Sequence, residues 1–576
     1  MKQFQGVAAS RGIGIGPVFQ FRRAALSFDS HCIDNVDAEL KRLEGALKIS
    51  SEQITRVYEK AQKEATADQA EIFQAQLMMV EDPEFIGQVR NTISEEKINA
   101  EAALMKVAQV YSDTLRAMED EYFAARALDV QDVATRVLRT LLGVAESPTE
   151  GLLHPSVIFA DDLTPSDTVL LDKRLVLGFC TAQGSATSHT AILARSLGLP
   201  AVAGVGADVL YIENGTSIIV DGGNGLLIVE PSAEIIASYT TRRENSHAMQ
   251  VQAMKHAFEP AITRDGKRYE VSSNIGNIEG GRKALENGAE GIGLLRTEFL
   301  YLERQNLPSE EEQYQAYKQI LDLYKEKPVI LRTLDVGGDK ELPYLEMPNE
   351  LNPFLGLRAI RLCMAKPELL KAQLRAALRA GVGNNLWIMY PMVATANEVR
   401  AANRVLEACK AELKAEGKPF TDDAKVGIMV EIPSAAINAD QLAKVVDFFS
   451  IGTNDLSQYT MAADRTNPLV ESLSNAFQPA VLRLIRSTIQ AAHAQGKWVG
   501  MCGELAGEPA AVPILVGLEL DEFSVNPPVV PLVKQIIRSL DSNEMKELAR
   551  QALELESPEE IKALVQERVP LTRPEG

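Results

Sequence analysis

The chain has 576 residues, of which 46% are hydrophobic and 24% charged, and it carries a formal net charge of −20 at pH 7. This length exceeds one ordinary hydrophobic core, so we expect two to four domains. The negative charge disfavours nonspecific binding to nucleic acid, and no apolar run is long enough for membrane insertion.

The cysteines and the N-terminus indicate a cellular compartment. Five scattered cysteines include no CxxC pair, which argues against a disulfide framework and against a structural zinc site. The first residues, "MKQFQGVAASRG", lack the apolar core of a signal peptide. We therefore expect a cytoplasmic protein.

Two kinds of pattern alternate in the first 230 residues. Residues 1–30 and 147–230 are rich in glycine, β-branched residues and turn signals, as in "GVAASRGIGIGPVFQF" and "GTSIIVDGGNGLLIVEP". Between Ala46 and Leu142, one glycine and one proline interrupt a charge-rich sequence whose apolar positions recur at helical spacing. The pattern predicts an α/β domain over 1–30 and 147–230, with a helical bundle inserted over 31–146.

A histidine stands where a helix is predicted to begin in the second α/β stretch. In "GSATSHTAILARSLGLP", Thr187 and Ser188 are good helix caps, and an amphipathic run follows through Leu197. His189 therefore lies in the first helical turn, where free N–H groups and the helix dipole stabilise an anion such as a phosphate carried on the ring. The alternative is a histidine that only caps the helix or packs.

The second half of the chain alternates β-rich segments with amphipathic helices. A polar helical stretch over 231–264 predicts an interdomain linker. Within 265–576, eight β-rich segments separated by helical stretches predict a (β/α)8 TIM barrel, with a doubly wound open sheet as the alternative. These segments are "YEVSSNIG", "GIGLLRT", "PVILRTLD", "LWIMYPMV", "KVGIMVEIP", "DFFSIGTND", "KWVGMCGE" and "LDEFSV".

Polar residues gather at the C-terminal ends of these predicted strands, where such barrels hold their active sites. They are Arg296, Arg332, Glu431, Asn454, Asp455 and Cys502. Two carboxylates suit one hard divalent cation such as Mg²⁺, and the arginines, with Arg465, offer planar forks for phosphate and carboxylate. A thiol can protonate an enolate. Singly, each residue also fits a salt bridge or a buried filler; together they predict a site for a small, multiply charged anion.

With these residues assembled, the sequence closely resembles enzyme I of the bacterial phosphoenolpyruvate:sugar phosphotransferase system, over essentially the whole chain. "TSHTAILAR" is similar to the family's phosphohistidine signature, and "DFFSIGTNDLSQYTMAADR" to the signature of its substrate-binding barrel. Further matches are "RTEFL", "RTLDVGGDKELPY", "NPFLGLRAIR" and "GMCGELAG". The resemblance implies a phosphoenolpyruvate-protein phosphotransferase. Such an enzyme passes the phosphoryl group of phosphoenolpyruvate to its own histidine and then to a histidine of the phosphocarrier HPr, releasing pyruvate in the first step of sugar uptake.

The resemblance also implies roles for individual residues. His189 would accept the phosphoryl group, with a hydrogen bond from Thr168, and Cys502 would protonate enolpyruvate; Glu431 and Asp455 match the Mg²⁺ ligands. The positions that match substrate-binding residues are Arg296, Arg332, Lys340, Arg358, Asn454 and Arg465. The helical insert resembles the docking region for HPr, with an apolar contact from Met78, Met79 and Phe85, each of which burial inside the insert would explain equally well. By the same resemblance, the barrel is expected to form a homodimer.

Three rival functions share parts of this pattern. Phosphoenolpyruvate synthase and pyruvate phosphate dikinase need a large nucleotide-binding domain, which we do not expect in a chain of 576 residues with His189 so early. The nitrogen-regulatory paralogue usually carries an N-terminal sensor domain, which we do not expect here. A noncatalytic binding protein would have no use for the full set of charged residues. Because His189 would serve both the barrel and the insert, we expect its domain to swing about the segment from Pro231 to Arg264.

Overall fold

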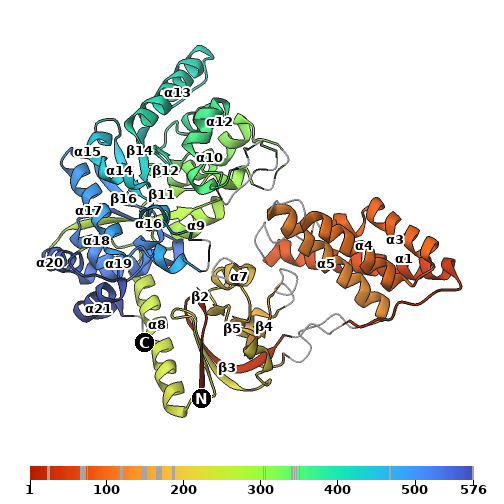
Figure 1. The fold of residues 1–576 in the computed structure, drawn as a ribbon. Coiled ribbons are helices and arrows are strands. Elements are labelled where there is room, and N and C mark those ends of the chain that lie inside the picture. Colours follow the sequence, from red (N-terminus) through yellow and green to blue (C-terminus); the bar gives the residue numbers. More distant parts are fainter. Residues whose placement is uncertain are drawn as a thin grey trace. The chain divides into compact units, whose positions relative to one another are not determined.

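Figure 1 shows the computed structural model. It describes residues 1–21, 26–64, 73, 76–116, 121–144, 152–163, 171–184, 188–302, 304, 306–338, 342, 344–345, 347–348, 350–465, 467 and 469–573. The chain divides into two compact units, residues 1–243 and 244–576. The boundary falls inside helix α8 (Ala233–Lys255), within the segment interpreted above as a linker.

The first unit contains an eight-stranded mixed sheet in the order β1-β8-β7-β3-β4-β5-β6-β2. Strands on both sides of the helical insert share this sheet, since β3 and β4 pair in parallel. The strands are β1 (Lys2–Gln5), β2 (Val7–Ser10), β3 (Ile13–Gln20), β4 (Ser156–Ala160), β5 (Val176–Thr181), β6 (Ala201–Ala203), β7 (Ser217–Asp221) and β8 (Leu226–Val229). Helix α7 (His189–Leu197) packs against β2, β5 and β6, with Ala191, Leu193 and Ala194 in the core.

The helical insert has a core of its own. Leu43, Ile93, Leu104 and Val137 are among the fully buried residues that its helices share. The helices are α1 (Val36–Glu64), α3 (Pro83–Glu96), α4 (Ala100–Arg116) and α5 (Glu121–Leu142), and residues 76–80 are also helical. Asp82 caps α3, because its carboxylate accepts the N–H groups of Glu84 and Phe85.

The second unit is a closed barrel of eight parallel strands. Each strand pairs with the next, and the first strand, β10, pairs with both β11 and the last strand, β17. This closure confirms the predicted TIM barrel and excludes the open doubly wound sheet. The strands are β10 (Arg268–Ile275), β11 (Ile292–Leu295), β12 (Val329–Arg332), β13 (Leu386–Tyr390), β14 (Lys425–Val430), β15 (Phe448–Ile451), β16 (Trp498–Met501) and β17 (Glu522–Val525), with a short β9 (Ala261–Ile262) antiparallel to β10.

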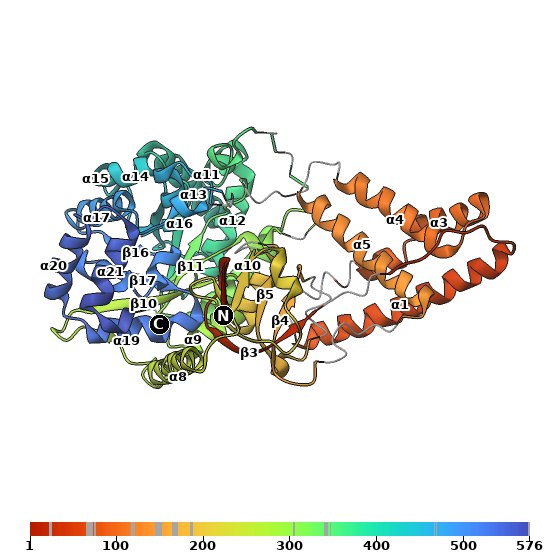
Figure 2. The same cartoon turned by 60° about the horizontal axis from the view of Figure 1, so that its bottom comes forward.

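Helices surround the barrel strands, as Figure 2 shows. They are α9 (Ile278–Glu286), α10 (Glu310–Tyr324), α11 (Ile360–Ala365), α12 (Pro367–Ala380), α13 (Ala396–Ala415), α14 (Pro433–Ile437), α15 (Ala439–Leu442), α16 (Thr453–Met461), α17 (Pro479–His493), α18 (Val512–Gly517), α19 (Val530–Ser539), α20 (Ser542–Ala552) and α21 (Pro558–Arg568). Side chains alternate along each strand. Tyr269, Val271 and Ile275 of β10 therefore join the core beneath the helices, whereas Ser272 and Asn274 face the barrel interior. None of the helices in the described part of the chain has the length and hydropathy needed to cross a bilayer.

Candidate active site

The structure gathers polar side chains at the mouth of the barrel. Arg332 is the last residue of β12, Glu431 directly follows β14, and Asp455 lies in the first turn of α16 just after β15. Cys502 directly follows β16. Because parallel strands end at the same end of a barrel, these residues from distant parts of the sequence meet at one rim.

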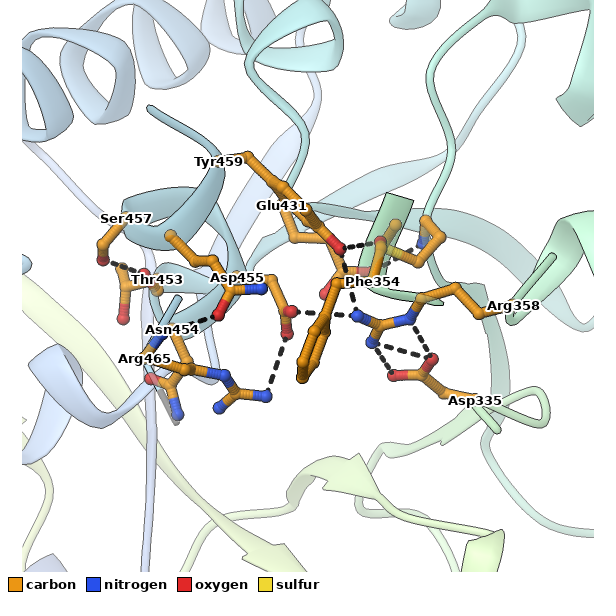
Figure 3. A network of polar contacts seen from close by, with 12 residues as sticks. Asp335, Phe354, Arg358, Glu431, Thr453, Asn454, Asp455, Ser457, Tyr459 and Arg465 are labelled. Carbon is orange, nitrogen blue, oxygen red and sulfur yellow. Dashed lines mark hydrogen bonds and ion pairs between the residues drawn. The ribbon is translucent and has the colours of Figure 1, made fainter. Parts of the chain in front are cut away.

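Two buried arginines organise this rim through a shared carboxylate. Asp335 accepts Arg358 Nη2 at 3.0 Å and lies 3.1 Å from Arg332 Nη1. Arg332 also pairs with Glu298 at 3.0 Å. Figure 3 shows Arg358 between Asp335 and Asp455, with Nη1 3.1 Å from Asp455. Burial disfavours both guanidinium charges, but these carboxylates outweigh it and raise the pKa of each arginine. The cluster is therefore a fixed set of charges.

A glycine allows the two chain segments of this cluster to approach closely. Gly337 has a φ of 105°, and a Cβ at this position would lie 2.6 Å from Cβ of Arg358. Any larger residue would push apart the loops that carry Asp335 and Arg358. The segment "LDVGG" after β12 thus holds the arginine of "GLRAIR" in place.

Glu431 is a fully buried carboxyl group beside this cluster. Its Oε1 accepts the N–H of Met392 at 2.6 Å, and Met392 has a φ of 56°, which a residue other than glycine seldom adopts. Burial, reinforced by the carboxylates of Asp455 and Asp335, raises the pKa of Glu431 well above its ordinary value. A cation beside Glu431 and Asp455 would relieve that repulsion.

The donor set at this point suits a hard divalent cation bound partly by a ligand. Two carboxylates, Glu431 and Asp455, supply oxygen donors, and Gly452 leaves the edge of Glu431 open: a Cβ there would lie 3.1 Å from Oε2. The described residues contain no group of three or more His, Cys, Asp or Glu side chains arranged to hold a metal ion. Two carboxylates leave positions for substrate oxygens and water, as Mg²⁺ sites commonly do.

Cys502 is buried at the same rim. Its thiol lies 3.9 Å from the carbonyl oxygen of Ile451. Burial raises the pKa of this thiol to about 11, although the Ser450 hydroxyl and the Arg332 guanidinium act in the opposite direction. The sulfur therefore holds its proton at neutral pH, as a proton donor must.

The other predicted barrel residues differ in their surroundings. Arg465 Nη2 lies 3.7 Å from Asp455, and Asn454 Oδ1 accepts the N–H of Glu504 at 3.1 Å. Arg296 is exposed after β11, with no side-chain partner among the residues that the structure describes. The Nε atoms of Arg332 and Arg465 are buried and lack partners there as well, so they are donors that an anion can satisfy. Lys340 lies outside the described residues.

In the first unit, the backbone agrees with the predicted helix start. Helix α7 begins at His189, and the Ser188 side chain accepts the N–H of Ala191 as its N-cap. Gly198 ends the helix in the left-handed conformation. Thr168 lies outside the described residues. The structure thus places the backbone of His189 at a helix N-terminus, where the dipole favours an anion.

The three predicted docking residues of the insert do not share one surface. Met78 is 64% exposed, and Met79 packs at the edge of the bundle core. Phe85 is only 1% exposed and meets Tyr111 edge to face at 5.4 Å. The prediction of Phe85 as a contact to a partner is therefore corrected: its ring fills the core between α3 and α4.

Sequence reasoning missed three members of the barrel cluster. Glu298 and Asp335 pair with the arginines, and the Tyr459 hydroxyl accepts Arg358 Nη1 at 3.1 Å. A signal was present for Tyr459, which lies one helical turn after Asp455. Asp335 lies beyond the end of β12, where no helical spacing links it to Arg332. Glu298 lies two residues after Arg296 in "RTEFL", and the sequence pattern singles out only the arginine of this motif.

The family model "PEP-utilising enzyme, PEP-binding domain" matches residues 250–542, about half of the chain. The models "PEP-utilising enzyme, N-terminal" and "PEP-utilising enzyme, mobile domain" match residues 5–126 and 152–225.

Relatives match nearly the whole chain. The phosphoenolpyruvate-protein phosphotransferase of Staphylococcus carnosus (strain TM300) is 48% identical over 567 residues, covering 98% of this chain and 99% of its own. That of Bacillus subtilis (strain 168) is 46% identical, covering 98% and 100%. An NMR structure of an Enzyme I protein aligns with 42% of this chain and 99% of its own at 39% identity and a TM-score of 0.39. Since that TM-score is low, the sequence relatives carry the assignment: the chain belongs to the family of phosphoenolpyruvate-protein phosphotransferases.

Proposed function

We propose that this chain transfers the phosphoryl group of phosphoenolpyruvate to His189 and then to a histidine of the phosphocarrier HPr. The observation that carries the proposal is the buried cluster of Arg332 and Arg358 with Asp335 and Asp455 at the barrel mouth. Fixed charges of this kind, with unsatisfied arginine donors, suit a small substrate that bears both phosphate and carboxylate. We also infer a cytoplasmic location.

The barrel residues bind and orient the substrate in this proposal. The residues that hold its phosphate and carboxylate are Arg296, Arg332, Lys340, Arg358, Asn454 and Arg465. Glu431 and Asp455 hold Mg²⁺, which when bound offsets negative charge on the transferring group. Because Asp335 and Glu298 already fix Arg332 and Arg358, these two side chains need little reorganisation when charge moves during transfer.

His189 is the nucleophile. A neutral imidazole nitrogen attacks phosphorus, the bond from phosphorus to the bridging oxygen breaks, and the enolate of pyruvate departs. The N–H groups at the start of α7 stabilise the phosphate then carried on the ring, and Thr168 orients the histidine.

Cys502 completes the reaction on the barrel. Its thiol passes a proton to the methylene carbon of the enolate, which yields pyruvate. The protonated state that burial imposes on Cys502 supports this role.

Two partners follow from the proposal. HPr docks on the helical insert, with Met78 as its exposed apolar contact and Met79 beside it. A second copy of the chain joins through the barrel to form a homodimer, which the relatedness to enzyme I supports.

Incubation with labelled phosphoenolpyruvate and Mg²⁺ tests the proposal. The wild-type chain is expected to gain one acid-labile phosphoryl group without ATP and to lose it when HPr is added. His189→Ala is expected to abolish labelling, whereas His247→Ala, a histidine on α8, serves as the matched control and labels normally. Labelling of His189→Ala at the wild-type level would contradict the proposal, and a requirement for ATP would favour the dikinase-type alternative.

A further inference from the structure

One buried carboxyl group in the barrel has no role in the reaction described so far. Glu522 begins β17 and is 1% exposed. Neither carboxyl oxygen makes a hydrogen bond to a residue that the structure describes; the Ser272 hydroxyl and the Met501 N–H are near enough to affect its pKa but lie outside hydrogen-bond geometry. A buried carboxylate with no partner costs several kcal/mol, so this group is held neutral, with its proton.

The surrounding strands are shaped around this side chain. Glu522 lies opposite Glu270 of β10 and Gly500 of β16 in the sheet register. A Cβ on Gly293 would overlap with Oε1 of Glu522, and a Cβ on Gly500 would overlap with Oε2. Two glycines therefore leave the space in the barrel interior that the carboxyl group occupies.

Cys502 lies on the same wall of the barrel interior. Side chains alternate along a strand, so Gly500 and Cys502 face the same side, with Cys502 about 7 Å further toward the mouth. A charge on the Glu522 carboxyl group raises the pKa of the Cys502 thiol, and the Arg332 guanidinium lowers it. No charged side chain that the structure describes lies between the thiol and the carboxyl group on β16 and β17, whose sequences there are "GMC" and "EFSV".

Hydroxyl and amide side chains line this wall at the depth of Glu522 and at the depth of Cys502. Ser524 Oγ lies 2.6 Å from Asn274 Oδ1, and Asn274 Nδ2 donates to the carbonyl oxygen of Cys502 at 3.0 Å. Ser272 lies beside Glu522, and Ser450 lies beside the Cys502 thiol. By contrast, Trp387, Met389, Met429 and Phe448 make the wall formed by β13, β14 and β15 apolar.

The polar wall continues to the other end of the barrel. Glu270 alternates with Ser272 and Asn274 on β10 and is half-buried, and burial raises its pKa, as does the neighbouring Glu290. Glu270 in turn raises the pKa of Glu522. Ionisable or hydroxyl side chains thus run from the N-terminal end of the strands, through Glu522, to the thiol at the mouth.

The proposed reaction requires a proton source for Cys502, and these groups can provide one. Each turnover removes the proton of Cys502, while phosphoenolpyruvate and the incoming His189 occupy the mouth. We propose that Glu522 is the proton-supplying residue that restores the Cys502 thiol, and that Glu270 recharges it from the N-terminal end of the barrel. This inference rests on the proposed function and assigns Glu522 a role that acts through Cys502.

Each proton transfer in this scheme has a donor and an acceptor. The S–H bond of Cys502 breaks as the C–H bond of pyruvate forms, which leaves a thiolate. The O–H bond of Glu522 then breaks and the S–H bond of Cys502 forms again, so that the proton moves from the carboxyl oxygen to the sulfur. Glu270 returns a proton to the Glu522 carboxylate and takes one from solvent.

Comparison of the first turnover with later turnovers tests this role. In Glu522→Gln, the stoichiometric burst of His189 phosphorylation is expected to match wild type, because Cys502 starts with its proton. Steady-state pyruvate formation with HPr is expected to fall about tenfold, and its solvent deuterium isotope effect to rise, because reprotonation becomes limiting. Glu270→Gln is expected to show a smaller fall of the same kind.

The pH profile gives a readout that a structural role would not move. The protonated form of Glu522 is the donor, and burial raises its pKa to about 8, so wild-type kcat is expected to fall as the pH rises through that value. The ionisable groups near Glu522 are Glu270 on β10, Cys502 just after β16, and Asp521, the residue before Glu522. On β11 the residue that faces Glu522 is Gly293, which has no ionisable side chain. Glu522→Gln is expected to remove this fall.

A control separates the possible failures. Glu310→Gln, on α10 outside the barrel interior, removes a carboxylate that pairs with Arg375 and Arg379, and should lower stability without changing the ratio of burst to steady state. Equal steady-state rates in Glu522→Gln and wild type, or equal losses of burst and steady state, would overturn the inference. Absence of a burst in wild type would instead overturn the proposed function.

Discussion

The arginines of the barrel mouth depend on their partners for both charge and position. Arg358 is 3% exposed and is held by Asp335, Asp455 and Tyr459, while Phe354 lies beneath its guanidinium. Such a group is costly to bury without compensation. The same contacts use the N–H groups of the guanidinium and fix its position at the barrel mouth.

Removal of this one cation is therefore expected to have a double effect. Arg358→Met should lower the free energy of unfolding by about 3–5 kcal/mol, because Asp335 and Asp455 lose a buried partner. It should also raise the KM for phosphoenolpyruvate. Denaturant titration and initial rates measure the two effects, with Arg379→Met on α12 as the control that keeps the KM. An unchanged KM in Arg358→Met would contradict its assignment to the substrate site.

Glu522 makes a pH-dependent contribution to stability that does not depend on the catalytic proposal. Its pKa in the folded chain is raised to about 8 by burial, above the value of about 4.3 expected when unfolded. The native state therefore binds more protons between these values, and its stability falls as the pH rises through that window.

Glu522→Gln removes this dependence. The variant is expected to gain stability relative to wild type as the pH rises from about 5 to 8, by an amount on the order of 1 kcal/mol or more at the upper end. Thermal unfolding at several pH values measures the difference. A constant difference across this range would show that folding does not raise the pKa of Glu522.

At the scale of elements, helix α3 divides residues that belong to the core from residues that face outward. Its buried residues Phe85, Val89 and Ile93 recur at helical spacing and pack into the bundle. Met78 precedes this helix and remains exposed. A substitution at Met78 can therefore alter a surface contact of the insert without disturbing the core of the insert.

Two alanine variants separate these roles. Phe85→Ala is expected to lower the free energy of unfolding of the insert by about 3–5 kcal/mol, because it leaves a cavity beside Tyr111. Met78→Ala is expected to change stability by less than about 0.5 kcal/mol while raising the Kd for HPr. Calorimetry and binding titration measure the two quantities. If Met78→Ala binds HPr with wild-type affinity, Met78 is not part of the docking surface.

At the scale of the molecule, the chain consists of two units whose boundary lies within α8. This helix is predominantly exposed, with Ala253 as its buried residue, so few apolar contacts hold it along its length. A polar connection of this kind suits a unit that moves relative to its neighbour.

Energy transfer between fluorophores tests that motion. Labels on Tyr211→Cys and Ile437→Cys, both exposed positions, in a Cys32→Ser background report the distance between the units. Phosphoenolpyruvate with Mg²⁺ is expected to shift the distance distribution, and addition of HPr to shift it back. A matched pair within the barrel, Val382→Cys with Ile437→Cys, should not respond. One unchanged distribution in all conditions would contradict the swing.

Local patterns in the sequence determined the elements of this protein. Period-2 and period-3.6 apolar spacing, together with glycine and proline punctuation, predicted the eight barrel strands, the inserted helices and the helix that begins at His189. The polar residues that end the strands could also be predicted as one group, because parallel strands of a barrel share one rim. These features depend on neighbours a few residues away.

Only the tertiary structure decided which side chains meet. Arg358 and Asp455 are separated by 97 positions, and nothing local in either segment specifies their ion pair. The sequence left Phe85 open between a surface contact and burial, and only packing against α4 places it in the core. Glu522 lies in a predicted strand, and barrel closure buries it. Burial and pairing depend on contacts between distant segments, and these exist only after the chain has closed on itself.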